Sequence, residues 1–436
     1  MGLRISTKLF VISIGTAASV RITRNVSEHD AVTIMGHENQ DATKNGIDEN
    51  FSIEKQLSKR HKRQVWKDHY ATHSGSSIVY YRFDSSINGS LKQAFVDATK
   101  LWETGTCLKF RESLTATEGI LVTENFHENC YTDSDERNHI ISLCEACSEV
   151  SDVAHEIGHA LGLPHAQNRR DRDGHVIVNW SNIRSEYNAM ALLEEFDPNN
   201  PPVTPEDHQK QYDKMEENDE AYYGIPYDLG SIMQYAPSNE NATVIAKDKN
   251  YSRTMGSPFV SFTDKLLVNK HYNCSEFCRE ETAVQCANNG FLDPKDCNTC
   301  VCPKGFGGKS CEKRPDGCGQ DVEARTEWQT INLTIYNRDN NGEYMECTVW
   351  ILADPGKKIE VQIVGVSTGL DSTGCGKAGV EIKMKNDTRL TGYRFCSDED
   401  NGISLKSNSN LVPVIMYSKV ATPLDVILNY HSVSST

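Results

Sequence analysis

The pattern of apolar and polar positions after residue 64 begins with a mixture of strands and helices. Two segments have helical spacing, residues 91–103 and residues 151–161, and the second helix should end at Gly162. The apolar positions of the first are Phe95, Ala98, Leu101 and Trp102. Short runs of β-branched and aromatic side chains predict strands at residues 77–83, 108–110 and 120–122. The chain from Gly162 to about residue 274 is expected to be loop-rich.

Two later stretches have different patterns and indicate separate modules. Residues 275–312 are dense in Cys and Gly, and a segment this short needs disulfides because it cannot bury a sufficient core. Residues 318–432 contain alternating apolar stretches, for example at residues 358–364, and predict an all-β sandwich. At 436 residues the chain is too long for one core, which agrees with several domains.

The first 63 residues have the features of targeting and processing segments. Basic residues precede a short apolar run at residues 9–18, so residues 1–19 are interpreted as a signal peptide rather than an uncleaved anchor. Residues 20–63 are polar and end in Lys59-Arg60-His61-Lys62-Arg63. This dibasic pattern favours a propeptide that a proprotein convertase removes after Arg63; the alternative is a solvated charge run.

Composition and charge indicate the compartment and exclude one class of partner. Fifteen cysteines, none before Cys107, and nine Asn-x-Ser/Thr triplets predict a secreted, extracellular protein. The odd count leaves one thiol outside the pairs within this chain. No transmembrane segment is expected, because no stretch is long and apolar enough. The net charge of −16 argues against nucleic acid as a partner.

The chemistry is concentrated in residues 154–165, Ala-His-Glu-Ile-Gly-His-Ala-Leu-Gly-Leu-Pro-His. Positions four apart share one face of a helix, so His155 and His159 can bind one ion. Glu156 lies beside them and can take a proton from a water that zinc activates. Gly162 allows the helix to end abruptly, which lets His165 approach as a third ligand. This extended pattern is the metzincin signature. It is far more specific than His-Glu-x-x-His alone, which an amphipathic helix with two solvent-facing histidines could also show.

A second segment, Tyr227-Asp-Leu-Gly-Ser-Ile-Met-Gln-Tyr235, is expected to lie beneath that helix. Met233 suits an apolar floor under the imidazoles because its thioether adapts to irregular gaps. Tyr235 can direct its hydroxyl into the site. Taken alone, a Met and a Tyr in a loop are usually packing residues.

These motifs resemble the astacin family of metzincins, and the resemblance covers nearly the whole chain. It implies an α+β zincin catalytic domain, residues 64–274, with two subdomains around a cleft. It also implies one zinc bound by His155, His159 and His165, Glu156 as the general base, and Tyr235 as a ligand that swings away to stabilise the oxyanion. A zinc metalloendopeptidase made as a zymogen follows, with extracellular protein as substrate, matrix or cuticle protein being the guess.

The resemblance extends to the cysteines. It implies the bridges Cys107–Cys274 and Cys130–Cys147, with Cys144 left over, although the residues alone leave a Cys130–Cys144 pair open. Residues 275–312 look like an EGF-like module and residues 318–432 like a CUB domain, the arrangement of many nematode astacins. The pairs implied there are Cys278–Cys297, Cys286–Cys300, Cys302–Cys311, Cys318–Cys347 and Cys375–Cys396.

Among the departures from the family pattern, two support a competing function. Ala166 stands where the family carries Glu after the third histidine, so the mature amine near Gln64 loses an acidic partner. Gln234 replaces the usual His next to Met233. The alternative is a degenerate protease that acts as an extracellular binding or adhesion protein through its EGF-like and CUB modules. The propeptide residue that blocks the zinc in the precursor is also unassigned, since Glu38 and Asp41 match the family's blocking carboxylate only loosely.

Overall fold

The structure is a computed structural model. It describes residues 11–14, 18–21, 72–73, 76–125, 130–134, 138–191, 204–215, 222–237, 241–278, 284–338 and 342–434. The predicted signal peptide and propeptide lie outside these ranges, apart from a short hairpin of β1 (Val11–Ile14) and β2 (Ala18–Arg21) that tests neither. In the described part of the chain, no helix has both the length and the apolarity to cross a membrane.

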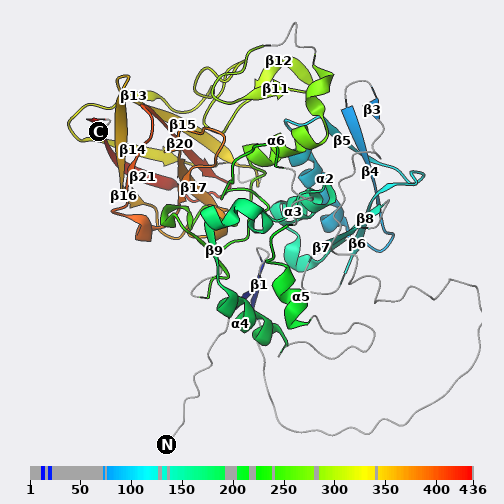
Figure 1. Ribbon diagram of the computed structural model, residues 1–436. Helices are drawn as coiled ribbons and strands as arrows, with labels where there is room; N and C mark the ends of the chain where they lie inside the picture. Colours follow the sequence, from blue (N-terminus) through cyan, green and yellow to red (C-terminus); the bar gives the residue numbers. More distant parts are fainter. Residues whose placement is uncertain are drawn as a thin grey trace, which may run out of the picture.

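A six-stranded sheet forms the first layer of the region that carries the site, at the blue-to-cyan end of Figure 1. Its strands are β3 (Thr72–His73), β4 (Ser76–Phe83), β5 (Leu108–Glu112), β6 (Gly119–Glu124), β7 (Tyr131–Ser134) and β8 (Asn138–Leu143). The order is β3-β4-β6-β8-β7 with β5 also beside β4, and only the outer strands β3 and β7 run antiparallel. The predicted strands are therefore confirmed, and the edge strand β7 borders the site.

Helices α2 (Gly89–Glu103) and α3 (Val150–Ala160) pack on this sheet and on each other. Asn88 caps α2 by accepting a hydrogen bond from the Leu91 amide, which is why the helix begins there. The indole of Trp102 donates to the Ala154 carbonyl at 2.9 Å and fixes α2 against α3. Both predicted helices are confirmed, although Leu101 lies on the exposed side of α2.

The chain after the second helix contains more regular structure than the loop-rich prediction allowed. It forms α4 (Trp180–Ala191), α5 (Pro205–Lys210), α6 (Phe262–His271) and the antiparallel pair β9 (Val176–Val178) and β10 (Val244–Ala246). Short 3₁₀ turns accompany them at Ala166–Asn168, Arg170–Gly174, Lys249–Tyr251 and Cys274–Phe277, and another, Glu145–Cys147, precedes α3. The loop-rich prediction was wrong for α6, whose Ser261 and Asp264 form a capping box that a motif search for helix starts would have found.

Disulfides connect the two ends of the region from Cys107 to Cys274 and staple the module that follows it. The pairs Cys107–Cys274 and Cys130–Cys147 are present, so the alternative Cys130–Cys144 pair is excluded. A hairpin of β11 (Phe291–Asp293) and β12 (Asp296–Val301) carries the pairs Cys278–Cys297, Cys286–Cys300 and Cys302–Cys311. Cys144 takes part in none of the disulfides that the described residues form and is buried, with its sulfur 3.0 Å from that of Cys147.

The last part of the chain is the predicted two-layered β-sandwich, residues 321–434, called the C-terminal sandwich below. One sheet has the order β13 (Asp321–Glu323), β15 (Met345–Leu352), β20 (Leu411–Ser418), β17 (Ala378–Ile382) and β18 (Tyr393–Phe395). The other has the order β14 (Gln329–Ile335), β21 (Leu424–Ser434), β16 (Lys357–Val366) and β19 (Ser404–Lys406). Alternate residues of β21 are buried, as expected for a strand with one face on a core. Two further 3₁₀ turns, Thr373–Cys375 and Asp398–Asp400, and the bridges Cys318–Cys347 and Cys375–Cys396 complete it.

The hydrophobic core does not follow the boundaries that the sequence suggests. One cluster joins α2, α3 and the six-stranded sheet, and it includes Met233. A second cluster runs from Ala166, Val176 and Tyr251 directly into the inner faces of the C-terminal sandwich. In Figure 1 the sandwich, coloured yellow to red, accordingly lies against the green segments around β9.

Candidate functional site

The three predicted histidine ligands converge in the structure. The Nε2 atom of His165 lies 3.2 Å from that of His155 and 3.0 Å from that of His159. All three potential ligand atoms lie within 4.8 Å of one another. The convergence depends on Gly162, which has φ 89° and allows the chain to turn back after α3. The Gly162 amide donates to the His159 carbonyl and the Leu163 amide donates to the Gly158 carbonyl, which fix this turn.

Backbone carbonyls hold two of these rings by their other nitrogen. His155 Nδ1 donates to the Ile232 carbonyl at 2.7 Å, and His159 Nδ1 donates to the Leu163 carbonyl at 2.9 Å. Because a carbonyl only accepts, each of these rings carries its proton on Nδ1 and directs a lone pair from Nε2 into the shared space. Converging lone pairs are unfavourable unless a cation accepts them, so this donor set fits a zinc ion.

Glu156 lies beside the histidines and is buried, with 4% of its surface exposed. The hydroxyl of Thr132, on the edge strand β7, lies 2.8 Å from its Oε2 atom and 2.9 Å from its backbone carbonyl. Sequence reasoning missed Thr132, because nothing in its local pattern marks it. One turn earlier on α3, burial together with Glu149 and Glu156 raises the pKa of Asp152 to about 6.

The segment with Met233 lies under α3, as predicted; this helix, which carries His155 and His159, is called the zinc helix below. An ideal Cβ built on Gly158 would be 2.6 Å from the Met233 sulfur, so the helix and this turn are in direct contact. Asp264, at the start of α6, accepts from the Ser231 hydroxyl at 2.6 Å and from the Ile232 amide at 3.0 Å. Burial raises the pKa of Asp264 to about 6 despite these bonds. Ile232 thus connects Asp264 to His155, a second contribution that the sequence did not indicate.

The two departures from the family pattern are accommodated differently. Gln234 is buried and accepts from the Tyr227 hydroxyl at 2.5 Å, while its own amide donates to the Tyr235 carbonyl at 3.2 Å. Ala166 is buried, and its amide donates to the Met233 carbonyl at 2.9 Å. The Tyr235 ring lies 4.3 Å from the His165 ring, between centroids. Gln234 therefore has hydrogen-bond partners for both its amide oxygen and its amide nitrogen.

A pocket borders this turn. Its lining includes Ala166, Asp228, Met233 and Asp264, but none of the three histidines. We therefore do not assign the substrate to it.

The three histidines form a group that can hold a metal ion on a mixed α/β scaffold, and the comparisons with known proteins point to a zinc metalloproteinase family. The family model described as Astacin, a peptidase family, matches residues 64–273. The chain belongs to the astacin family.

Two relatives from Caenorhabditis elegans illustrate the similarity. The chain is 38% identical over 388 residues to zinc metalloproteinase nas-31, covering 86% of this chain and 59% of the relative. It is 30% identical over 357 residues to zinc metalloproteinase nas-26, covering 77% of this chain and 78% of the relative. The chain thus spans little more than half the length of nas-31. A hatching-enzyme zinc protease from Oryzias latipes matches with TM-score 0.38 and 22% identity, over 47% of this chain and 94% of that one.

Proposed function

We propose that this chain is a zinc-dependent endopeptidase that hydrolyses peptide bonds in extracellular proteins. The observation that carries the proposal is the convergence of three imidazole Nε2 atoms beside the buried carboxylate of Glu156. When bound there, zinc supplies electrophilic activation of a water and of the scissile carbonyl. A protein substrate follows from the family, and matrix or cuticle protein is the specific guess.

In this proposal each residue of the site has a separate role. His155, His159 and His165 would hold the zinc ion, and the carbonyls of Ile232 and Leu163 keep two of the rings oriented. Glu156 takes a proton from the attacking water and passes it to the leaving amine, since a carboxylate within reach of both groups can serve as base and then acid. The Thr132 hydroxyl contacts Oε2 of Glu156, which leaves Oε1 for the water. The Tyr235 hydroxyl donates to the developing oxyanion.

Maturation and secretion form part of the same proposal. The precursor is secreted, and a proprotein convertase cuts it after Arg63. Residues 64–274 then act as the catalytic domain, followed by an EGF-like module at 275–312 and a CUB domain at 318–432. The three short-range disulfides of the first module and the two of the sandwich support these assignments. With Ala166 after the third histidine, the mature amine meets no carboxylate at that position.

The competing function is a degenerate protease that binds or adheres through its C-terminal modules. Ala166 and Gln234 motivate it. Two observations weigh against it. Gln234 is hydrogen-bonded in its buried position. The three histidines, Glu156 and Tyr235 are all present.

The test uses the full chain, cut after Arg63, and measures bound zinc and peptide hydrolysis separately. Wild type should hold one zinc and cleave members of a peptide library. Glu156→Gln should keep the zinc and lose hydrolysis, whereas His159→Ala should lose both. His431→Gln changes a histidine of the C-terminal sandwich and serves as the matched control. Absence of stoichiometric zinc, or undiminished hydrolysis by Glu156→Gln or with a chelator present, would overturn the proposal. Zinc binding without any hydrolysis would favour the competing function.

A further inference from the structure

The C-terminal sandwich contacts the turn that supports the zinc site. We infer that Thr391 of this sandwich is a positioning residue for the segment from Asp228 to Met233, so that the sandwich is part of the catalytic unit and not a tethered binding module. This inference rests on the proposed zinc site. Modules joined by short linkers are by default expected to move relative to one another, so a fixed arrangement needs specific contacts.

The first contact joins the carboxylate of Asp228 to Thr391. Asp228 is buried, with 4% of its surface exposed. It accepts four hydrogen bonds. Two come from its own region, from the Gly230 amide at 3.0 Å and the Thr263 hydroxyl at 2.8 Å. The other two come from the sandwich, from the Thr391 amide at 3.2 Å and the Thr391 hydroxyl at 3.0 Å. A buried carboxylate is costly unless its oxygens are paired, so Asp228 depends on the sandwich for half of its partners.

Asp228 is connected to the metal ligands through the backbone of the turn. Its carbonyl accepts from the Ser231 amide at 3.2 Å, and the next residue, Ile232, provides the carbonyl that accepts from His155 Nδ1. A displacement of Asp228 therefore reaches His155 through four residues of continuous chain. Outer hydrogen-bond partners of metal-binding histidines commonly affect metal affinity because they orient the ring.

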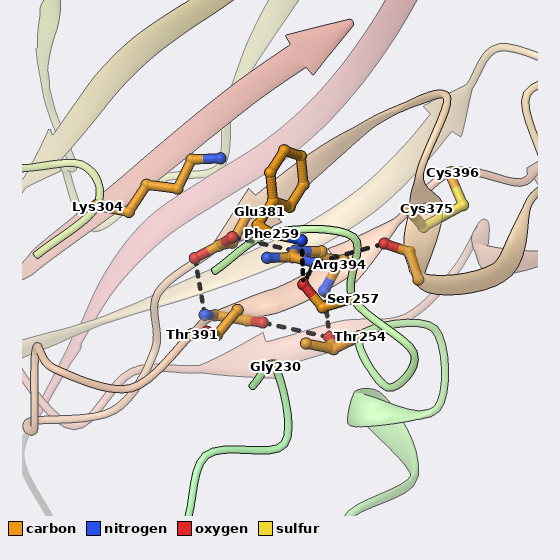
Figure 2. A network of polar contacts seen from close by, with 12 residues as sticks. Gly230, Thr254, Ser257, Phe259, Lys304, Cys375, Glu381, Thr391, Arg394 and Cys396 are labelled. Atoms are coloured by element: carbon orange, nitrogen blue, oxygen red, sulfur yellow. Dashed lines mark hydrogen bonds and ion pairs between the residues drawn. A yellow bond between two sulfur atoms is a disulfide. The ribbon is translucent and has the colours of Figure 1, made fainter. Parts of the chain in front are cut away.

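Close packing reinforces this hydrogen bonding. A Cβ atom added to Gly230 would lie 2.4 Å from the Thr391 Cβ and Cγ2 atoms, so a glycine is required where the two regions touch. Figure 2 shows Gly230 facing Thr391 at this point. On the neighbouring loop, a Cβ on Gly374 of the sandwich would lie 2.2 Å from the Gly256 carbonyl oxygen. The two regions are thus in close contact at two glycines, Gly230 against the Thr391 side chain and Gly374 against the Gly256 backbone.

A buried ionic network anchors the same interface (Figure 2). Arg394 pairs with Glu381 at 3.1 Å inside the sandwich, and both side chains are almost fully buried. The Arg394 guanidinium also donates to the Ser257 hydroxyl of the catalytic region at 2.8 Å. Its backbone amide donates to the Thr254 hydroxyl at 3.0 Å. Arg394 therefore has partners on both sides of the boundary.

Further contacts lie on either side of this network. Arg253 of the catalytic region forms ion pairs with Asp371, Glu399 and Asp400 of the sandwich. Lys304 of the disulfide-stapled module lies 4.4 Å from the Phe259 ring centroid and 4.7 Å from that of Tyr417. All three parts of the chain therefore meet here, and a hydrophobic cluster also runs from the catalytic region into the sandwich.

The experiment compares three substitutions at this interface in the mature full chain, two that remove a hydroxyl and one that keeps it. Thr391→Val keeps the shape and the amide but removes the hydroxyl that Asp228 needs. Thr391→Ser keeps that hydroxyl. Ser257→Ala removes a partner of Arg394 and does not touch the turn. The readouts are the rate of zinc transfer to a chromophoric chelator, hydrogen exchange of the segment 228–235, and kcat and KM separately.

Thr391→Val should release zinc about fivefold faster and lower kcat with little change in KM, since the turn and not substrate binding is disturbed. Faster exchange of segment 228–235 should accompany this. Thr391→Ser and Ser257→Ala should behave like wild type. Equal zinc release and kcat for Thr391→Val and wild type would overturn the inference. So would equal effects of Thr391→Val and Ser257→Ala, because they would indicate a general loosening of the interface.

A second pair of variants protects the test against a misfolded Thr391→Val protein. Gly230→Ala should produce the same pattern from the other side of the contact, whereas Gly174→Ala, whose Cβ would meet nothing within 4 Å, should be neutral. An unchanged Gly230→Ala protein would contradict the inference. Zinc release and hydrogen exchange do not require peptidase activity, so an inactive wild type refutes the proposed function while these readouts still decide the role of Thr391.

Discussion

Gly158 lies in the zinc helix between Glu156 and His159, and its replacement by Ala tests how tightly that helix contacts the turn below it. The added methyl would be 2.6 Å from the Met233 sulfur and 3.1 Å from a ring carbon of Trp102. Heavy atoms in favourable contact lie about 3.5–4.0 Å apart. Trp102 cannot retreat easily, because its indole donates to the Ala154 carbonyl and the side chain is fully buried. Met233 must therefore move by about 1 Å.

Two opposing effects set the size of the change. Ala is favoured over Gly in a helix by about 1 kcal/mol. Overfilling a packed core costs about 1–3 kcal/mol, and Met233 has only 2% of its surface exposed. We expect a net loss of about 1 kcal/mol in the free energy of unfolding. The effect on function should be larger, because a shift of Met233 reaches Ile232 and hence His155; we expect kcat/KM to fall about tenfold.

The assay measures kcat/KM and urea-induced unfolding of the mature chain. Gly89→Ala is the matched control, since Gly89 also lies in a helix and its Cβ would meet nothing within 4 Å. It should be neutral or slightly stabilising. If Gly158→Ala is more stable than wild type and fully active, then the helix and the turn are not in tight contact and the reasoning is wrong.

Three further substitutions probe the proton chemistry, the interface and the core. Tyr235→Phe should lower kcat about a hundredfold with zinc content and KM nearly unchanged, because one oxyanion donor is lost; unchanged kcat would exclude that role. Burial raises the pKa of Glu381, but Arg394, Lys304 and Lys383 outweigh it and lower the pKa from 4.5 to about 2. The carboxylate therefore stabilises the fold above pH 4.5, and this contribution disappears as the pH falls towards 2. Glu381→Gln should cost roughly 3 kcal/mol at pH 7 and show less loss of stability between pH 4.5 and 2, as measured by urea unfolding; identical pH profiles would contradict this. Trp102→Phe should lower the free energy of unfolding by about 2 kcal/mol, because the buried Ala154 carbonyl loses its donor, and thermal unfolding will show no shift if that bond is unimportant.

The sequence alone determined the parts of the site that depend on local geometry. Four-residue spacing on a helix places His155 and His159 on one face, and Gly162 permits the turn that brings in His165, whatever the rest of the fold does. The strands and the two main helices of the first layer also follow from short-range patterns. α4 was missed because residues 180–191 lack a clear apolar stripe.

Only the tertiary structure decided what surrounds the ligands. Thr132 meets Glu156 across 24 residues, and Thr391 meets Asp228 across 163. The sequence around neither threonine indicates its role, because a single hydroxyl is also common on surface strands and loops. The sequence likewise could not decide whether Cys130 pairs with Cys147 or with Cys144; the structure shows the Cys130–Cys147 disulfide. Local patterns specify which side chains share a helix face, whereas contacts between distant segments depend on how whole layers pack, which no short stretch of sequence encodes.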